Sequence, residues 1–263
     1  MLALANCIVT VQPGQPPLVT LTGEVNYEST DSIKEAIEGL LHDGLTRIAM
    51  DCSSVDFIDS SGIGTIIRWA QKLRAAGGEL VLRSATQQTV HALQISGFAD
   101  LLNIEHVYDS PRPERKPCVS GLWQQVKFSI PLPADKNGLI RQRVTELAES
   151  MPFSRYQIDD IRLAVGEAVS NAIRHGCNGG ESDRLSVNCT GDEEKLVIRV
   201  RYPGDKFDPD AVPIPDPCNP REGGMGIYFM RASMDSVDYT FDETGTTVTM
   251  TKYIGARIKN NGN

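Results

Sequence analysis

The pattern of apolar and polar positions in the first part of the chain alternates between strand-like and helix-like segments. Short apolar runs, which are typical of buried strands, occur at residues 18–21, 47–51 and 79–82. Apolar residues with a helical period predict helices at residues 31–41, 61–76 and 86–96. Gly97 follows the third of these and is expected to end it. This alternation predicts a sheet with helices packed against it.

A second set of elements follows residue 120. Strands are predicted at residues 126–130, 185–189 and 195–202, and helices at residues 139–150, 159–175 and 226–234, followed by two closing strands. The segment Gly-Asp-Glu-Glu between the second and third strands predicts a hairpin. Six prolines lie between residues 203 and 224, and a loop of that length is usually functional or disordered.

A break in the pattern divides the chain into two domains. Residues 109–118 read Asp-Ser-Pro-Arg-Pro-Glu-Arg-Lys-Pro-Cys, which has no periodic apolar positions and is typical of a linker. The length of 263 residues also favours two domains over one. We therefore predict a first domain at residues 1–109, a linker at 110–120, a second domain at 121–256 and a disordered tail at 257–263. The expected fold class is α/β (α+β) in both domains.

Charge and cysteine content exclude several classes of protein. The net charge of −8 consists of 6 basic and 13 acidic residues in positions 1–110, and 20 basic and 21 acidic residues in positions 111–263. Neither part is basic enough to indicate nucleic-acid binding. The six cysteines form no C-x-x-C pair, so neither a zinc site nor a disulfide framework is indicated. Because no signal peptide or 18-residue apolar run is visible, we expect a cytoplasmic protein that does not interact with membranes.

The first motif that can carry chemistry is Asp59-Ser60-Ser61-Gly62, between an apolar strand and a helix. One of Asp59, Ser60 and Ser61 is expected to be the helix N-cap, and a cap needs no further function. A phosphate on a serine at this position would also meet free backbone N–H groups and the positive end of the helix dipole, although Asp59 would repel it. The motif is therefore either a simple cap or a phosphorylation switch.

A family resemblance sharpens the second interpretation. The segment from Asp51 to Ile67, with Gly23-Glu-Val-Asn upstream and Leu93-x-x-x-Gly-Phe downstream, resembles the STAS domain of bacterial anti-sigma factor antagonists over residues 5–108. In that family the first serine after the aspartate is phosphorylated by a dedicated kinase, and the unmodified form binds this kinase and releases its sigma factor. The resemblance implies that Ser60 is the phospho-acceptor.

The second motif is a row of polar residues on the predicted helix at residues 159–175. Apolar residues share one face of this helix, while Glu167, Asn171 and His175 follow one another at intervals of four on the other. One interpretation is the solvated side of an amphipathic helix. The other is a functional site, because a carboxylate, a carboxamide and an imidazole can supply a base, a metal ligand and a donor to phosphate.

Glycines downstream of this helix indicate a phosphate site. In Glu222-Gly-Gly-Met-Gly-Ile, three glycines precede or open a helix, where backbone N–H groups can approach a polyphosphate without obstruction. Together with the asparagine helix, Phe207-Asp-Pro and Gly245-Thr-Thr-Val-Thr-Met, this segment resembles the GHKL ATP-binding fold, in the branch of anti-sigma factor serine kinases, over residues 122–254. The resemblance implies a Bergerat-type α/β sandwich that uses ATP and magnesium.

The same resemblance implies roles for individual residues. Asn171 would be the magnesium ligand, and Glu167 would be the catalytic carboxylate that deprotonates the substrate serine. Nucleotide-binding positions would be Asn171, His175, Gly204, Asp208, Gly223, Gly224, Gly226 and Thr246. The chain departs from the family at Tyr202, which replaces the aspartate that accepts a hydrogen bond from the adenine amine, and at Lys206, which replaces a glycine. Both replacements place the binding of ATP and magnesium in question.

Two functional hypotheses remain after these comparisons of motifs. The first is a partner-switching regulator of a sigma factor or similar pathway, in which a serine kinase domain phosphorylates Ser60 of its own or another antagonist domain with Mg-ATP. Its partners would be an anti-sigma kinase, a STAS protein, a sigma factor or a phosphatase, and the chain could form a homodimer. The alternative is a non-catalytic docking protein whose nucleotide site has decayed, which Tyr202 and Lys206 favour. A histidine-kinase fragment fits less well, because no helix with a phospho-accepting histidine precedes the ATP-binding segment.

Overall fold

The computed structural model describes residues 7–108, 124–131, 137–176, 184–212 and 225–255, which form two compact units. The first unit carries strands β1 to β6 and the second carries strands β7 to β11. The predicted linker at residues 110–120 and the predicted tail at 257–263 lie outside the described residues. Within the described ranges, no helix has the length and apolar character that crossing a bilayer requires.

The first unit is built on a mostly parallel sheet. Its strands, in spatial order, are β1 (Ile8–Gln12), β2 (Leu18–Val25), β3 (Arg47–Ile58), β4 (Glu79–Thr86) and β5 (Asn103–Ile104), while β6 (Val107–Tyr108) also pairs with β4. Among the described strands of this unit, only β1 and β2 pair in the antiparallel sense. The helices are α1 (Thr30–His42), α2 (Ser60–Ala75) and α3 (Gln87–Ser96), with 3-10 turns at Tyr27–Ser29 and Ala99–Leu101. All six elements predicted for this part of the chain are confirmed.

The apolar pattern explains how this unit packs. In α1, the buried residues Ile33, Ile37 and Leu40 recur at helical spacing. In β2, buried and partly exposed positions alternate along the whole strand, as expected when one face of a sheet meets the core. Gly97 ends α3 in the left-handed conformation, with φ 76°, as predicted. Strands β1, β5 and β6 were not predicted, because β1 is largely exposed and the other two have only two residues each.

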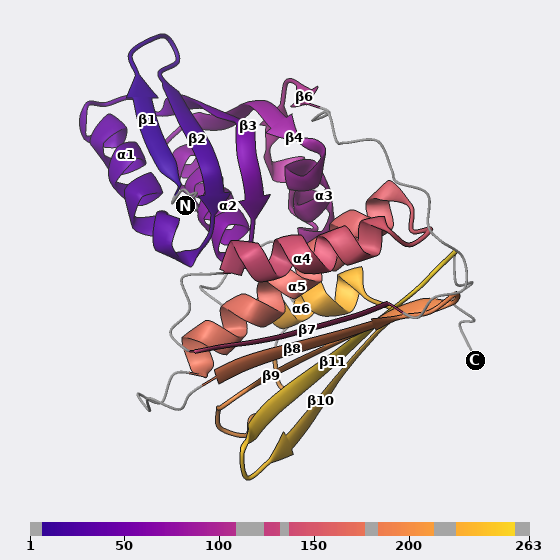
Figure 1. Cartoon of the computed structure of the whole chain (residues 1–263). Coiled ribbons are helices and arrows are strands. Elements are labelled where there is room, and N and C mark those ends of the chain that lie inside the picture. Colours follow the sequence, from indigo (N-terminus) through magenta and orange to yellow (C-terminus); the bar gives the residue numbers. More distant parts are fainter. Residues whose placement is uncertain (1–6, 109–123, 132–136, 177–183, 213–224, 256–263) are drawn as a thin grey trace, which may run out of the picture. The chain divides into compact units, whose positions relative to one another are not determined.

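The second unit is an antiparallel sheet covered by helices (Figure 1). Its spatial order is β10 (Ser236–Asp242), β11 (Gly245–Tyr253), β9 (Lys195–Tyr202), β8 (Arg184–Gly191) and β7 (Gln124–Pro131). The helices α4 (Asn137–Glu149), α5 (Arg155–His175) and α6 (Met225–Ser233) lie on one face of this sheet. The hairpin predicted between β8 and β9 is confirmed by their antiparallel register.

One buried ion pair joins three elements of the second unit. The Lys252 ammonium on β11 lies 2.7 Å from Asp160 Oδ2 on α5 and donates a 2.5 Å hydrogen bond to the carbonyl oxygen of Ser233, the last residue of α6. A cation at the C-terminus of a helix also interacts favourably with the helix dipole. The pair therefore holds the end of α6 against α5 and the sheet.

Candidate functional site

The start of α2 is capped by Asp59. Its Oδ1 accepts hydrogen bonds from the backbone N–H groups of Ser61, at 2.8 Å, and Gly62, at 3.0 Å. This settles which of the three candidate residues is the N-cap. Ser60 is the first residue of the helix, and only 5% of it is exposed. The Asp59 carboxylate thus already occupies two of the N–H groups that a phosphate at this helix end would use.

Gly62 is required by packing rather than by the chemistry of the motif. A Cβ atom at this position would lie 2.7 Å from the carbonyl oxygen of Val25, 2.7 Å from Val25 Cγ1 and 2.9 Å from Ile58 Cγ1. Because one of these neighbours is backbone, it cannot move aside easily. The glycine therefore lets the first turn of α2 press against the ends of β2 and β3.

The polar row on α5 runs from the interior of the second unit outward. Glu167 is fully buried with 0% exposure, and Asn171 is partly buried. The interpretation of this row as a solvated helix face is therefore wrong for Glu167. His175 is the last residue of α5. Its pKa lies below the usual value, mainly because the ring is partly removed from water and secondly because the Arg174 cation is adjacent.

The start of α6 closes against two of these side chains. A Cβ atom at Gly226 would lie 2.7 Å from Glu167 Oε2, 3.3 Å from Asn171 Nδ2 and 3.4 Å from Asn171 Oδ1. The predicted catalytic carboxylate, the predicted metal ligand and one predicted phosphate-facing glycine are therefore brought together. Gly223 and Gly224 lie outside the described residues.

A second group of predicted residues surrounds Tyr202 at the end of β9. Only 4% of Tyr202 is exposed. A Cβ atom at Gly176 would lie 3.1 Å from a ring carbon of Tyr202, and a Cβ atom at Gly204 would lie 3.3 and 3.4 Å from two of its ring carbons. Thr246 pairs with Tyr202 across β11 and β9, is 0% exposed, and its hydroxyl has no hydrogen-bond partner among the described residues. Burial raises the pKa of Tyr202 to about 12, so the phenol is neutral at physiological pH.

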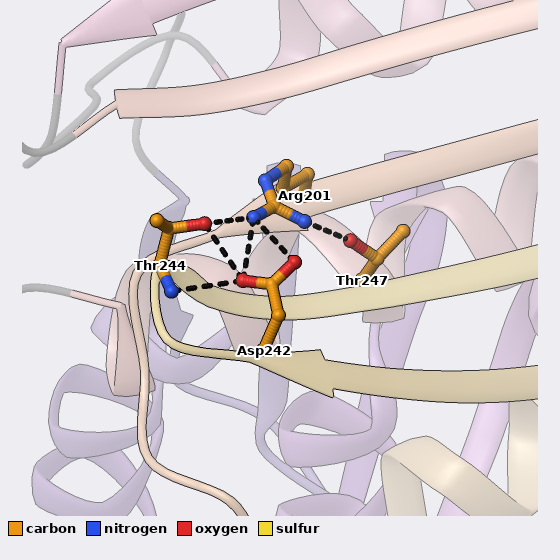
Figure 2. Close-up of polar contacts among 4 residues, drawn as sticks. All are labelled: Arg201, Asp242, Thr244 and Thr247. Atoms are coloured by element: carbon orange, nitrogen blue, oxygen red, sulfur yellow. Dashed lines mark hydrogen bonds and ion pairs between the residues drawn. The ribbon is translucent and has the colours of Figure 1, made fainter.

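The turn between β10 and β11 fixes the register of this pair. Figure 2 shows Arg201, on β9 next to Tyr202, with its guanidinium on Asp242 and Thr247. The guanidinium lies 2.8 and 2.9 Å from the two Asp242 oxygens and 2.8 Å from the Thr247 hydroxyl, and it also donates to Thr244. The hydrogen bonds from Arg201, and then those from the hydroxyl and the backbone N–H of Thr244, hold the pKa of Asp242 well below its usual range.

Gly245 completes this turn. Its φ of 133° is unfavourable for other residues, and a Cβ there would overlap the carbonyl oxygen of Tyr202. The turn can approach β9 this closely only because residue 245 is glycine. Together with the Arg201 network on the opposite face of the strand, it sets Tyr202 and Thr246 side by side.

Two aromatic residues that the sequence analysis did not single out, Tyr239 and Phe241, form a group with Phe207 next to the site. Phe207 packs edge-to-face on Tyr239 and Phe241 of β10, with ring centroids 5.3 and 5.4 Å apart. The pKa of Tyr239 is raised, first by burial and also by the nearby Tyr202 phenol and Glu167 carboxylate, while Arg231 opposes the shift. Tyr239 therefore lies in the electrostatic range of both groups of site residues. In the sequence, the aromatic Tyr239 stands between the polar residues Asp238 and Thr240. This alternation of apolar and polar positions along β10 is the signal that could have identified it.

Asp208 has a local role in the structure. Its Oδ1 accepts a 2.9 Å hydrogen bond from the backbone of Asp210, which in turn pairs with Arg231 of α6 at 2.6 Å. The loop after β9 is thereby attached to α6. Nothing in these contacts brings Asp208 to Glu167 or Asn171, so its part in nucleotide binding stays a prediction.

The residues present fit a nucleotide with a divalent metal. Gly226 has no side chain, so the start of α6 can lie directly against Glu167 and Asn171. The buried Thr246 hydroxyl has no hydrogen-bond partner within the described ranges and could accept or donate a bond to a ligand. Mg²⁺ commonly takes few protein ligands and fills its shell with phosphate oxygens and water, so the Asn171 carboxamide oxygen suffices as a protein ligand.

Comparisons with known proteins agree with this architecture. Residues 131–252 match the histidine kinase-like ATPase domain, and residues 8–111 match the STAS domain. The serine-protein kinase RsbW of Bacillus velezensis is 32% identical over 142 residues, which are 51% of this chain and 88% of that protein. RsbW of Listeria monocytogenes is 33% identical over 141 residues, 50% of this chain and 89% of that protein. The solved structure of the unphosphorylated anti-sigma factor antagonist SpoIIAA matches 37% of this chain and 87% of its own, with 22% identity and a TM-score of 0.33.

About half of this chain covers 88% and 89% of these two kinase relatives. The histidine kinase-like ATPase match lies in the second half of the chain, and the STAS match lies in the first. Both resemblances drawn from the motifs are confirmed. The chain belongs to the anti-sigma factor serine kinase family, and it carries a STAS domain ahead of the histidine kinase-like ATPase domain.

Proposed function

We propose that this chain is a partner-switching regulator whose kinase domain phosphorylates Ser60 of a STAS domain, its own or another copy's. The observation that carries the proposal is the convergence of Glu167 and Asn171 on Gly226, in a chain that also contains the acceptor motif. An enzyme and its substrate segment would thus be parts of one polypeptide. We expect it to act in the cytoplasm and to control a sigma factor or a similar target.

The proposed site assigns each group one task. When bound, Mg-ATP supplies the phosphoryl group. The Asn171 carboxamide oxygen would hold the metal, and the Glu167 carboxylate would accept the proton of the attacking serine hydroxyl. Burial of Glu167 keeps water away from this carboxylate, which strengthens its interaction with a hydroxyl that reaches it. Gly226, at the start of α6, would present its backbone N–H group to the phosphates.

Phosphorylation would alter the start of α2 directly. A phosphate on Ser60 adds about −1.5 to −2 charges next to Asp59, which caps this helix. The two anions repel each other and compete for the same N–H groups, so the first turn of α2 rearranges or its cap weakens. Because only 5% of Ser60 is exposed, we also expect the first turn to open before transfer. A partner that recognises the unmodified turn would then lose its surface.

The test is phosphate transfer by the full-length chain. Incubation with radiolabelled Mg-ATP, followed by peptide mass spectrometry, should place the phosphate on Ser60, and Ser60→Ala should abolish incorporation. Mixing the Ser60→Ala chain, which keeps its kinase site, with a Glu167→Gln chain, which keeps its acceptor, reveals transfer between molecules. Label confined to Ser61 contradicts the acceptor assignment, and no label in any mixture supports the docking-only alternative.

A further inference from the structure

Strand β1 forms one edge of the first sheet and is open on its outer side. Among the strands that the structure describes, it pairs with β2 alone, in a register that no bulge interrupts. Four of its five residues are exposed, and the apolar side chains of Ile8 and Val11 are 56% and 44% exposed. The row of backbone N–H and C=O groups on such an edge is a ready template for a further strand.

The other described sheet edges have protection that β1 lacks. Natural proteins block strand edges with charged side chains or with very short strands. At the opposite edge of the first sheet, β5 and β6 have only two residues each. In the second sheet, exposed Asp238 and Asp242 lie on edge strand β10, and exposed Lys127 lies on edge strand β7. Strand β1 has five residues, no charge and no proline.

The sequence around β1 is also free of charge. Glu24 is the first charged side chain of the chain, so residues 1–23 contain none. Because the whole chain has a net charge of −8, two copies repel each other overall, and this repulsion is weakest where no charged group is close. The uncharged edge is therefore a favourable place for two copies to meet.

The order of residues in β1 fits antiparallel pairing with a second β1. A two-fold axis at Thr10 places this residue opposite its own copy. Val9 then lies opposite Val11, and Ile8 lies opposite Gln12. Both valines pair with buried positions of β2, so they would extend the core-facing side of the sheet. Pairs of β-branched residues and of threonines stabilise neighbouring strands.

We infer that β1 is a dimerisation edge, where a second copy of this chain adds its own β1 in the antiparallel sense and joins the two first sheets. The interface is isologous, because both copies contribute the same strand. A strand of five residues buries little surface, so the dimer is weak and dissociates in the micromolar range. Dimerisation would also raise the concentration of one copy's Ser60 motif around the kinase domain of the other.

The test is sedimentation velocity of the full-length chain from nanomolar to high micromolar concentration. The native chain should change from a 28.8 kDa monomer to a species of twice that mass. Thr10→Lys and Thr10→Glu each place like charges across the two-fold axis and should raise the dissociation constant about 5- to 25-fold. An equimolar mixture of the two variants pairs opposite charges and should return the dissociation constant to within about threefold of the native value.

The matched controls are Thr240→Lys and Thr240→Glu. Thr240 is an exposed threonine on edge strand β10, and these replacements change the net charge of the chain by the same amounts. They should leave the dissociation constant unchanged. Because Thr10 is exposed as well, all four variants should keep the native circular dichroism spectrum.

Each contrary result has a distinct meaning. A native chain that stays monomeric at high micromolar concentration overturns the inference, and so does a dimer that neither Thr10 replacement weakens. If the mixture of variants dimerises no better than either variant alone, residue 10 does not face its own copy and the two-fold pairing is wrong. The inference concerns the first unit alone, so none of these results bears on the proposed kinase activity, and a failure of phosphate transfer leaves the dimer in place.

Discussion

The start of α2 and the site between α5 and α6 place polar groups in two different ways. In the first unit, Asp59, Ser60 and Gly62 are neighbours in the sequence, and Asp59 bonds to the N–H groups of its own helix. In the second unit, Glu167 and Gly226 come from separate helices and meet only because both pack against one sheet. Replacements in the first motif should therefore change the local stability of α2. Replacements in the second site should change function, because they alter contacts between residues that are far apart in the sequence.

The largest effect is expected from removing the buried carboxylate. Glu167→Gln keeps the size of the side chain but removes its basicity, so the rate of Ser60 phosphorylation should fall by about 10²- to 10⁴-fold. Initial rates with radiolabelled Mg-ATP measure the fall, and ATP affinity should change little. Glu193→Gln, in the exposed turn between β8 and β9, is the control. A loss of less than about tenfold would show that Glu167 is not the base.

Overpacking the start of α2 should produce the next largest effect. Gly62→Ala places a methyl group against the Val25 carbonyl and should lower the free energy of unfolding of the first unit by about 1–3 kcal/mol. Urea unfolding followed by fluorescence of buried Trp69, with Trp123 replaced by phenylalanine, measures this change.

Gly39→Ala is the matched control for this change. Gly39 is exposed on α1 with no atom within 4 Å of its Cβ position, so alanine should instead stabilise the unit by about 0.5–1 kcal/mol. Equal effects of the two replacements would contradict the packing explanation for Gly62.

A smaller effect is expected from the cap itself. Asp59→Ala should cost about 0.5–2 kcal/mol in the same fluorescence assay, because it removes the acceptor for the Ser61 and Gly62 N–H groups. Asp59→Asn retains an acceptor oxygen and should cost much less. It should also reduce the destabilisation caused by Ser60→Asp, since one of the two repelling charges is gone. Additive effects of these two replacements would show that the charges do not interact.

The smallest effect near neutral pH comes from the Tyr202 phenol. Its pKa is raised to about 12 in the folded chain from an unfolded value near 10, so the unfolded state ionises first as the pH rises. The contribution of this group to stability is complete below pH 10 and is lost between about pH 10 and 12. Urea midpoints from circular dichroism at pH 9 and 11 should therefore differ less in Tyr202→Phe than in the native chain. An unchanged difference would place the phenol in a more solvated setting.

Local structure was largely predictable from the sequence. The apolar periods located the main helices and strands of both units, and the cap at Asp59 was among the predicted candidates. These features depend on side-chain spacing and on hydrogen bonds within a few residues. Strand β1 was missed because a mostly exposed edge strand carries little apolar signal.

Burial and contact across elements were decided by the tertiary structure. The spacing of Glu167, Asn171 and His175 was visible in the sequence, but the burial of Glu167 was not, since the same row fits a solvated helix face. The replacement at Tyr202 was also visible, whereas its position opposite Thr246, whose buried hydroxyl has no partner in the described part of the chain, required the register of β9 with β11. Sequence determines which chemical groups a helix or strand can present, because that depends on local period. Which of those groups lose their water and meet each other depends on how the elements pack, because desolvation is a property of the whole unit.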